Sequence, residues 1–364
     1  MIQNTNHIYY AGSFMLFVVL LMVSYVVRNE YVVRIDYEQS RKMQVMVELE
    51  NERLKKRSED RLYPFIKRNK TDNFYFKKFL EANYTTDRQV LEHIVHPFSG
   101  YVVCDYFLGT EVWKHRVNIN MTGKIDLEKV SDFHSIKNNS FVMVQVDKIT
   151  MFVKHVLPKL HVQIILITGQ WFLPQLKKSK VTDSILASEK IIKWFSQNPI
   201  WEYRDETKYH VFPFGIRHDD CLRYYNFLLT TKIDKKIYLS NMHCSVHKHL
   251  NKNHIRKMFP MLCNAAKIKY DDFLLKVSQS KFLVSTAGDR PDCYRHYEAI
   301  GLGTKPVSDI AFLYRNIFGS NMVYLNRTSL VNAVKYKTFH FRYEEVNRDL
   351  ITLAYWQEWM KTIT

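Results

Sequence analysis

The sequence predicts an α/β protein with two Rossmann-like domains that face a cleft, preceded by one transmembrane helix and a helical stalk. Three observations predict this: an uncharged segment over residues 8–27, a βαβ pattern over residues 141–167, and a second strand and helix series from residue 236. The chain has 364 residues and is 46% hydrophobic, which is enough for two domains with real cores. The expected regions are a short tail (1–7), the anchor (8–27), the stalk (28–75), an N-terminal domain (76–225), a C-terminal domain (226–340) and a closing helix (341–364).

The anchor has the clearest signal in the chain. Residues 8–27, IYYAGSFMLFVVLLMVSYVV, carry no charge, and a helix of this length rises about 30 Å, the thickness of the bilayer hydrocarbon. The preceding residues contain no Lys or Arg, and no small-residue cleavage site follows Val27, so we expect an uncleaved anchor. The following stalk is charged and helix-prone, with too few apolar a and d positions for a sustained coiled coil.

Two topology signals disagree. Basic residues follow the span, which by the positive-inside rule places the body in the cytoplasm: Arg28, Arg34, Arg41 and Lys42. Five N-x-S/T sequons mark glycosylation sites that would instead be lumenal: Asn69, Asn83, Asn120, Asn138 and Asn326. Sequence alone leaves the topology open.

The N-terminal domain shows a βαβ unit. FVMVQV (141–146) and QIILI (163–167) are typical buried strands. The helix between them is predicted by apolar residues at i, i+3, i+4, i+7 and i+8: Ile149, Phe152, Val153, Val156 and Leu157. This unit indicates a parallel sheet. We expect a helix near 185–196, with Trp194 in the core, and a strand over 209–214.

A break around residues 217–220 (RHDD) separates this series from the next. The second series is expected to have strands at 236–240, 281–286, 304–307 and 322–325, and helices near 253–264, near 271–278 and from about 293. The last helix is expected over residues 343–361.

Charge and cysteine content exclude some functions. The net charge of +17 favours polyanionic partners or simply gives a basic surface, but no nucleic-acid-binding signature accompanies it, so no nucleic acid is expected as a partner. The five cysteines form no CxxC motif, and the His-rich stretch 242–254 lacks the spacing of a closed zinc site. We therefore predict no metal site. In an oxidising compartment, Cys244 and Cys263 are one conceivable disulfide pair.

The stretch STAGDRPDCYRHYEAI (285–300) is the main candidate site. Ligands of parallel sheets bind beyond the carboxyl ends of the strands, where loops lead into helices. Ser285 and Gly288 lie in such a loop, and Asp292 is expected to cap a helix that begins near Cys293.

The charges in this stretch predict a nucleotide-sugar donor site. A helix N-terminus near Arg290 and Arg295 favours phosphate, and the Glu298 carboxylate can accept two hydrogen bonds from a ribose diol. The alternative is that Arg290 pairs with Asp292 and that Glu298 is a solvated helix residue.

The segment FLVSTAGDRPDCYRHYEAIGLGTKPV (282–307) resembles the donor-site signature of exostosin-like glycosyltransferases. A small-residue loop, an arginine-rich turn, an E-A pair and a G-x-x-P-V strand follow one another in the same order. Residues 141–170 and 185–216 resemble the N-terminal half of membrane-anchored proteins of this family, and the resemblance covers roughly residues 95–330.

This resemblance implies the GT-B fold and a single-pass type II protein of the Golgi or endoplasmic reticulum membrane. It also implies transfer of a sugar, with inversion, from a nucleotide-diphosphate donor, first of all a UDP-sugar, to a glycan or glycoprotein. The residues that match the family pattern are Arg290 and Arg295 on the diphosphate side, Glu298 at the ribose, and Gly303 and Pro306 behind the nucleotide. Gly169-Gln170-Trp171 depart from the pattern, so the acceptor sugar is not implied.

Inverting transfer needs positive charge on the leaving diphosphate and a general base near the acceptor hydroxyl. Arg256 lies in the first helix of the second series. Together with Arg290 and Arg295, it would supply the positive charge on the leaving diphosphate. No D-x-D triplet lies in a donor loop, so no cofactor is required, although a divalent cation could contribute.

The candidates for the base are Asp147, at the end of strand 141–146, and His218 with Asp219 in the break. Each has a structural alternative: Asp147 would cap the helix from Lys148, and His218 would be a polar linker residue. A second hypothesis for the whole chain is a non-catalytic, membrane-anchored protein of the same fold that binds glycans or a partner.

Overall fold

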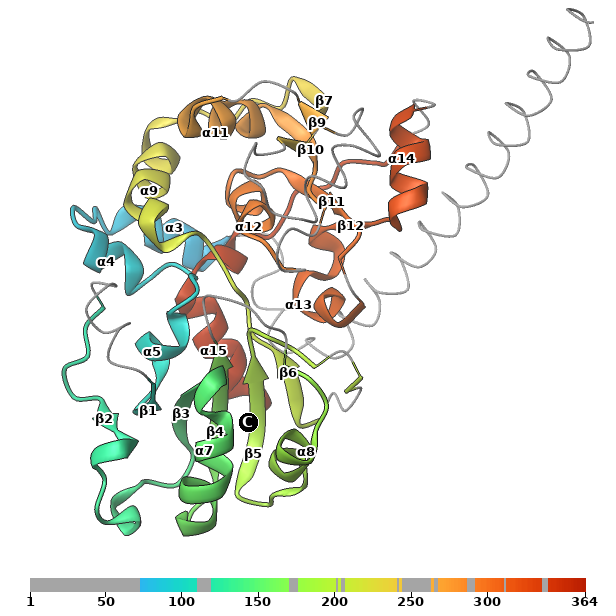
Figure 1. The fold of residues 1–364 in the computed structure, drawn as a ribbon. Helices are drawn as coiled ribbons and strands as arrows, with labels where there is room; N and C mark the ends of the chain where they lie inside the picture. Colours follow the sequence, from blue (N-terminus) through green and yellow to red (C-terminus); the bar gives the residue numbers. More distant parts are fainter. Residues whose placement is uncertain are drawn as a thin grey trace, which may run out of the picture.

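The structure analysed is a computed structural model. It describes residues 73–109, 119–169, 176–200, 202–203, 207–240, 242–243, 263–264, 268–286, 292–310, 312–335 and 340–364. In these ranges the chain is an α/β protein with parallel sheets, as predicted (Figure 1). None of the described helices is long and apolar enough to cross a membrane. The predicted anchor and all but the last residues of the predicted stalk lie outside the described residues.

The first sheet has six parallel strands in the order β2-β1-β3-β4-β5-β6. Its strands are β1 (Tyr106–Leu108), β2 (Ile125–Asp126), β3 (Ser140–Gln145), β4 (Ile164–Gly169), β5 (Ile191–Ser196) and β6 (Tyr209–Val211). The apolar runs of β3 and β4 are buried almost throughout, which is typical of strands covered on both faces. These two strands and β6 confirm three sequence predictions.

The helix after β3 is also confirmed, although it is irregular. It runs through the short turns η3 (Val146–Lys148), α7 (Ile149–Met151), η4 (Phe152–Val156) and η5 (Leu157–Lys159), and η4 is a π-helical turn. The expected apolar face is buried at Ile149, Phe152, Val156 and Leu157.

The predicted helix over 185–196 is wrong. The helix is α8 (Lys180–Ala187), which begins earlier because Ser179 and Thr182 form a reciprocal capping box. The apolar residues that follow form β5 between β4 and β6. Trp194 lies in the core as expected, and its indole N–H donates to the Thr168 hydroxyl at 2.8 Å.

The second sheet has four parallel strands in the order β12-β11-β10-β7. They are β7 (Ile237–Ser240), β10 (Ser280–Val284), β11 (Lys305–Ser308) and β12 (Val323–Tyr324), all near their predicted positions. The strands β8 (Met242–His243) and β9 (Cys263–Asn264) pair separately, so residue 263 is in a strand, not at the end of a helix. The helices of this half are α11 (Tyr270–Ser278), α12 (Tyr294–Gly301), α13 (Arg315–Phe318) and α14 (Arg327–Lys335).

The remaining helices join the two halves (Figure 1). They are α3 (Phe74–Glu81), α4 (Asp87–Leu91), α5 (Ser99–Val103) and α9 (Cys221–Thr230). The start of α3 lies within the predicted stalk, and α9 spans the boundary predicted between residues 225 and 226. One hydrophobic cluster holds residues of both halves, including Phe195 of β5 and Leu283 of β10.

The C-terminal segment returns to the first half. Residues 343–347 are not helical, in contrast to the prediction, and η10 (Arg348–Ile351) and α15 (Leu353–Ile363) follow them. The amide of Val95 donates to the Ile351 carbonyl at 2.9 Å, and the amide of Leu353 donates to the His93 carbonyl at 2.8 Å. In Figure 1, α15 lies beside the six-stranded sheet, where Trp359 packs edge-on against Phe195.

The linker between the sheets passes the N-terminal helices at Gly215. This glycine has a φ of 81°, and a Cβ atom there would collide with the backbone of Val95. The close approach brings the amide of Ile216 within 2.7 Å of the Val95 carbonyl, to which it donates.

Gly215→Ala is therefore expected to destabilise the protein by about 3 kcal/mol or more, from backbone strain plus the collision. The matched control is Gly123→Ala, because Gly123 has a similar φ of 79° but open space around it. The control substitution should lower the free energy of unfolding by only about 1 kcal/mol. Urea unfolding of the two variants measures the difference, and equal costs would show that the close approach at Val95 is not real.

Candidate functional site

The candidate site lies where β10 leads into α12. Ser285 and Thr286 follow the strand and are buried, and the amide of Ser285 donates to the Val307 carbonyl at 2.9 Å. The residues that follow, including the predicted contacts Gly288 and Arg290, lie outside the described residues, as does Arg256.

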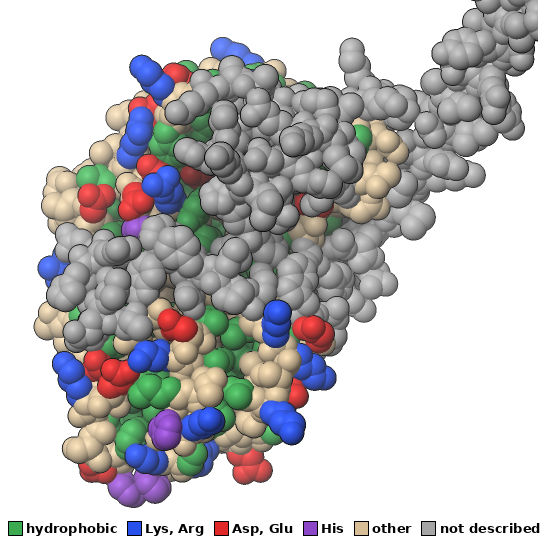
Figure 2. Space-filling model, viewed as in Figure 1, with side chains coloured by type: hydrophobic (Ala, Val, Ile, Leu, Met, Phe, Trp, Pro, Cys, Tyr) green, Lys and Arg blue, Asp and Glu red, His purple; other side chains and the backbone are tan. Residues whose placement is uncertain are grey.

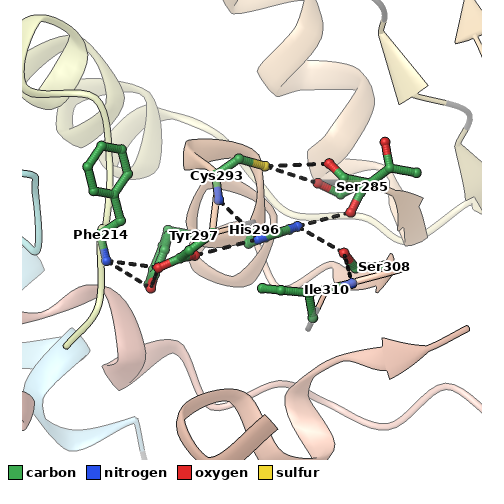
Figure 3. Close-up of polar contacts among 9 residues, drawn as sticks. Phe214, Ser285, Cys293, His296, Tyr297, Ser308 and Ile310 are labelled. Carbon is green, nitrogen blue, oxygen red and sulfur yellow. Dashed lines mark hydrogen bonds and ion pairs between the residues drawn. The ribbon is translucent and has the colours of Figure 1, made fainter. Parts of the chain in front are cut away.

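The N-cap of α12 is Cys293, so the expectation that Asp292 caps this helix is wrong. Asp292 is 1% exposed, and a buried carboxylate needs donors. It accepts from the amide of Phe214 at 3.0 Å and from the hydroxyl of Tyr297 at 2.7 Å (Figure 3). Asp292 therefore ties the interdomain linker to α12, because Phe214 belongs to the linker.

His296 connects α12 to the ends of two strands. Its Nε2 lies 2.9 Å from the Ser285 carbonyl oxygen and 3.2 Å from the Ser308 hydroxyl (Figure 3). Its Nδ1 accepts from the Cys293 amide at 3.3 Å and lies 3.6 Å from Asp292 Oδ1, an oxygen that has no hydrogen bond with any described residue. Burial lowers the pKa of His296, but Cys293 and Asp292 outweigh burial and raise that pKa to about 10.

Glu298 lies two residues further along α12. It is 4% exposed, so the alternative that it is a solvated helix residue is wrong. The Tyr270 hydroxyl donates to Glu298 Oε1 at 2.9 Å, whereas Oε2 has no hydrogen-bond partner among the described residues. Burial raises the pKa of Glu298 to about 7, and the positive charge of Arg295 opposes this rise.

Arg295 is half-buried on α12 and makes no ion pair with any residue that the structure describes. The alternative pairing of Arg290 with Asp292 falls on a residue outside that part of the chain. One unpaired guanidinium thus lies close enough to Glu298 to influence its ionisation.

The C-terminal end of α12 is held by two basic side chains. Lys235 Nζ donates to the Leu302 carbonyl at 2.8 Å, and Arg348 Nε donates to the Gly301 carbonyl at 2.8 Å. Gly303 ends the helix with a φ of 68°, as suits a glycine after a helix, and Pro306 follows in β11. Both ends of α12 are therefore fixed.

The linker brings its predicted residues to the same helix. The Phe214 ring stacks on Tyr294 at a centroid distance of 5.2 Å. Further along, His218 and Asp219 begin η6 (His218–Asp220), and His218 Nε2 lies 2.9 Å from Asp219 Oδ1. The negative charge of Asp220 in η6 also influences α12, because it contributes to the raised pKa of Glu298.

His218 is buried against the ring of Phe98, at a centroid distance of 5.0 Å, and burial lowers its pKa. Asp219 is half exposed and also pairs with Arg217 at 2.9 Å. The imidazole is thus neutral at pH 7, and its Nε2–H is oriented by a carboxylate.

Asp147 is not part of this group. It is exposed beyond the end of β3, and among the described residues its side chain accepts a hydrogen bond only from Gln145 Nε2, at 3.3 Å. The alternative that Asp147 caps the next helix is wrong, because Gln145 occupies the N-cap position of η3.

Sequence reasoning missed Tyr270, Tyr297 and Phe214 as parts of the site. Tyr270 is 28 residues from Glu298, and Phe214 is 78 residues from Asp292. The only available signal was that Tyr270 begins a predicted helix after a basic segment, which does not indicate a partner.

In the described part of the chain, no group of three His, Cys, Asp or Glu residues could hold a metal ion. Most of the His-rich stretch 242–254 and Cys244 fall outside it, so the conceivable pair with Cys263 does too. Comparison of the sequence with protein-family models finds no match, and comparison with curated proteins finds none either.

Proposed function

We propose that the protein is a glycosyltransferase of GT-B type that uses a nucleotide-diphosphate sugar, with a UDP-sugar as the first candidate. The observation that carries the proposal is Glu298, a buried carboxylate with one oxygen held by Tyr270 and the other without a described partner. A buried ionisable group with a raised pKa, placed beyond the end of a parallel strand, is typical of a ligand site.

The ribose diol of a nucleotide is a suitable ligand for this carboxylate. Two neighbouring hydroxyls donate two hydrogen bonds, and the oxygens of Glu298 can accept both, with Oε1 shared with Tyr270. Arg295 supplies a nearby positive charge for the diphosphate, and the N-terminus of α12 faces the end of β10. Arg290 and Arg256 would add to this charge.

For the chemistry we assign His218 as the general base and Asp219 as the group that orients it. Asp219 accepts the Nε2–H, so the lone pair is on Nδ1, a buried atom that acceptor binding would have to uncover. The base takes the proton of the acceptor hydroxyl while the oxygen of that hydroxyl attacks the anomeric carbon of the donor sugar. The bond to the diphosphate oxygen breaks, and the arginines stabilise the charge on the departing nucleotide; a divalent cation there would do the same work.

The acceptor would be a glycan or glycoprotein. The anchor at residues 8–27 would hold the enzyme as a single-pass type II protein of the Golgi or endoplasmic reticulum membrane. On the face shown in Figure 2, described Lys and Arg side chains are interspersed with Asp and Glu, a mixture that favours a solvated surface over a nucleic-acid-binding stripe.

Thermal-shift screening of the full chain in detergent against UDP, GDP, CMP and their common sugar conjugates tests the proposal. Binding to the native state raises the unfolding temperature by mass action, so we expect stabilisation by one nucleotide family. If no nucleotide stabilises the protein, the donor site is wrong and the non-catalytic glycan or partner binder becomes the better hypothesis.

Donor affinity should depend on pH. The pKa of Glu298 in the free protein is raised to about 7, and ribose hydroxyls donate only to its ionised form as a two-oxygen acceptor. Binding therefore lowers this pKa, so affinity rises as the pH increases from about 5.5 to 8. Isothermal titration with an intact nucleotide sugar, whose diphosphate does not titrate in this range, measures the slope, and a flat profile would contradict the role of Glu298.

A further inference from the structure

The structure separates the predicted glycosylation sequons by their geometry. An N-linked glycan is attached to the side-chain nitrogen Nδ2 of asparagine, so that nitrogen must reach solvent, while Oδ1 can still accept a hydrogen bond. The sequon asparagines in the described ranges are Asn83, Asn120, Asn138 and Asn326.

Asn83 is exposed in the turn between α3 and α4, with a φ of 52°. Its side chain makes no hydrogen bond with any described residue. The middle residue of the sequon, Tyr84, points inward: its amide donates to the Tyr225 hydroxyl at 3.2 Å and its ring stacks on His93 at 4.8 Å. The third residue, Thr85, is exposed. Tyr84 therefore anchors the turn and leaves the two recognition side chains in solvent.

Asn120 has the same arrangement. The middle residue, Met121, packs against the core, and the third residue, Thr122, is exposed. The amide of Thr122 donates to Asn120 Oδ1 at 3.0 Å, which forms an Asx turn and leaves Nδ2 as the available atom of the half-buried amide.

The other two sequons are tied into secondary structure. Asn138 Oδ1 accepts from the Gln163 amide at 3.0 Å, and its third residue, Ser140, is 6% exposed at the start of β3. Asn326 Oδ1 accepts from the Ser329 amide at 2.8 Å and so caps α14, just after β12. In the first, the hydroxyl residue of the sequon is therefore buried. In the second, Asn326 and Thr328 are exposed, but Asn326 Oδ1 is held at the start of α14 by a further 2.8 Å hydrogen bond from the Ser329 hydroxyl.

We propose that Asn83 and Asn120 carry N-linked glycans and that the folded body lies on the lumenal side of the membrane. In the attachment, Nδ2 loses a proton and bonds to the anomeric carbon of a lipid-diphosphate-linked oligosaccharide, whose bond to the diphosphate oxygen breaks. In Figure 1, α4 and β2, which neighbour these asparagines, lie along the left edge, whereas β10, β11 and β12 lie to the right. The glycans would therefore lie away from β10, β11 and β12.

This assignment would settle the conflict between the basic residues after the span and the sequons, in favour of the sequons. It does not depend on the donor site, since glycosylation requires only that the body enters the lumen.

The test uses the full chain expressed in cultured mammalian cells, with and without digestion by peptide N-glycosidase. Thr85→Ala and Thr122→Ala each remove one sequon without changing the asparagine, and Thr85→Ser and Thr122→Ser are matched controls that keep it. We expect digestion to speed migration of the wild type, each Ala variant to lose one mobility step, and the Ser variants to match the wild type. Mass spectrometry should find Asn83 and Asn120 converted to aspartate after digestion.

Either of two results would overturn the proposal. An unchanged wild-type mobility with unmodified asparagines at both positions would place the body outside the lumen. A mobility shift that survives in the double Thr85→Ala/Thr122→Ala variant, with no conversion at either asparagine, would assign the glycans to other sequons. Donor binding, measured on the same preparations, reports separately on the proposed enzymatic function.

Discussion

Glu298→Gln is expected to weaken nucleotide-sugar binding by about 10- to 100-fold, because it replaces hydrogen bonds from the ribose to a charged acceptor by weaker bonds to an amide. The measurement is isothermal titration at pH 8, where the wild-type carboxylate, with a pKa of about 7, is mostly ionised. Glu358→Gln is the matched control, since Glu358 is an exposed residue of α15. It should bind the donor like the wild type.

The same variant should not be less stable without ligand. The side-chain amide of Gln can still accept a hydrogen bond from the Tyr270 hydroxyl. The substitution also removes the free-energy cost of ionising a buried acid. The folded-state pKa is raised from 4.5 to about 7, so ionisation opposes folding above pH 4.5 and most strongly above pH 7. Glu298→Gln should therefore gain stability at pH 8 relative to the wild type, and the gain should fade toward pH 4.5. Loss of both binding and stability would indicate a structural role instead.

Asp292→Ala should destabilise the protein by about 2–4 kcal/mol, the second large effect. It removes the acceptor of the buried Tyr297 hydroxyl, leaves the Phe214 amide with only its longer 3.2 Å bond to that hydroxyl, and removes the carboxylate beside His296. Urea unfolding, read as a change in midpoint at constant slope, measures the cost.

The control is Asp272→Ala, because Asp272 is exposed on α11, and its effect should stay within about 0.5 kcal/mol. The pH dependence of the free energy of unfolding gives a second test. The raised pKa of His296 stabilises the fold fully below pH 6.5, and this contribution is lost as the pH rises toward 10. In Asp292→Asn that loss should be smaller. Equal stability of Asp292→Ala and Asp272→Ala would contradict the link between the linker and α12.

The sheets were predictable from the sequence where the strands are short apolar runs with turns on both sides. Residues 141–146 and 163–167 are such runs, and both form central strands. The helix prediction for residues 191–196 was wrong because the apolar residues there fit a helix face as well as a buried strand; they are Ile191, Ile192, Trp194 and Phe195. The capping box at Ser179 fixes the helix earlier in the chain, and the sequence analysis did not use it.

The candidate site was predictable only in part. Position beyond a strand and residue type predicted Ser285, Arg295 and Glu298 as candidates, because these depend on local sequence. The role of Asp292 did not follow, since a cap and a buried acceptor for a distant amide look alike in sequence. Tyr297 is close in sequence, but the Phe214 amide, 78 residues away, reaches Asp292 only because the linker packs against α12.

The central claim is that Glu298 binds the ribose diol of a nucleotide donor. It is tested most directly by a double-mutant cycle that combines Glu298→Gln with a 2′,3′-dideoxy analogue of the nucleotide that stabilises the protein. We predict that removing the two hydroxyls weakens binding about 10-fold or more in the wild type and hardly at all in the variant. If the dideoxy analogue loses the same affinity in both proteins, Glu298 does not contact the ribose, and the donor-site assignment is wrong.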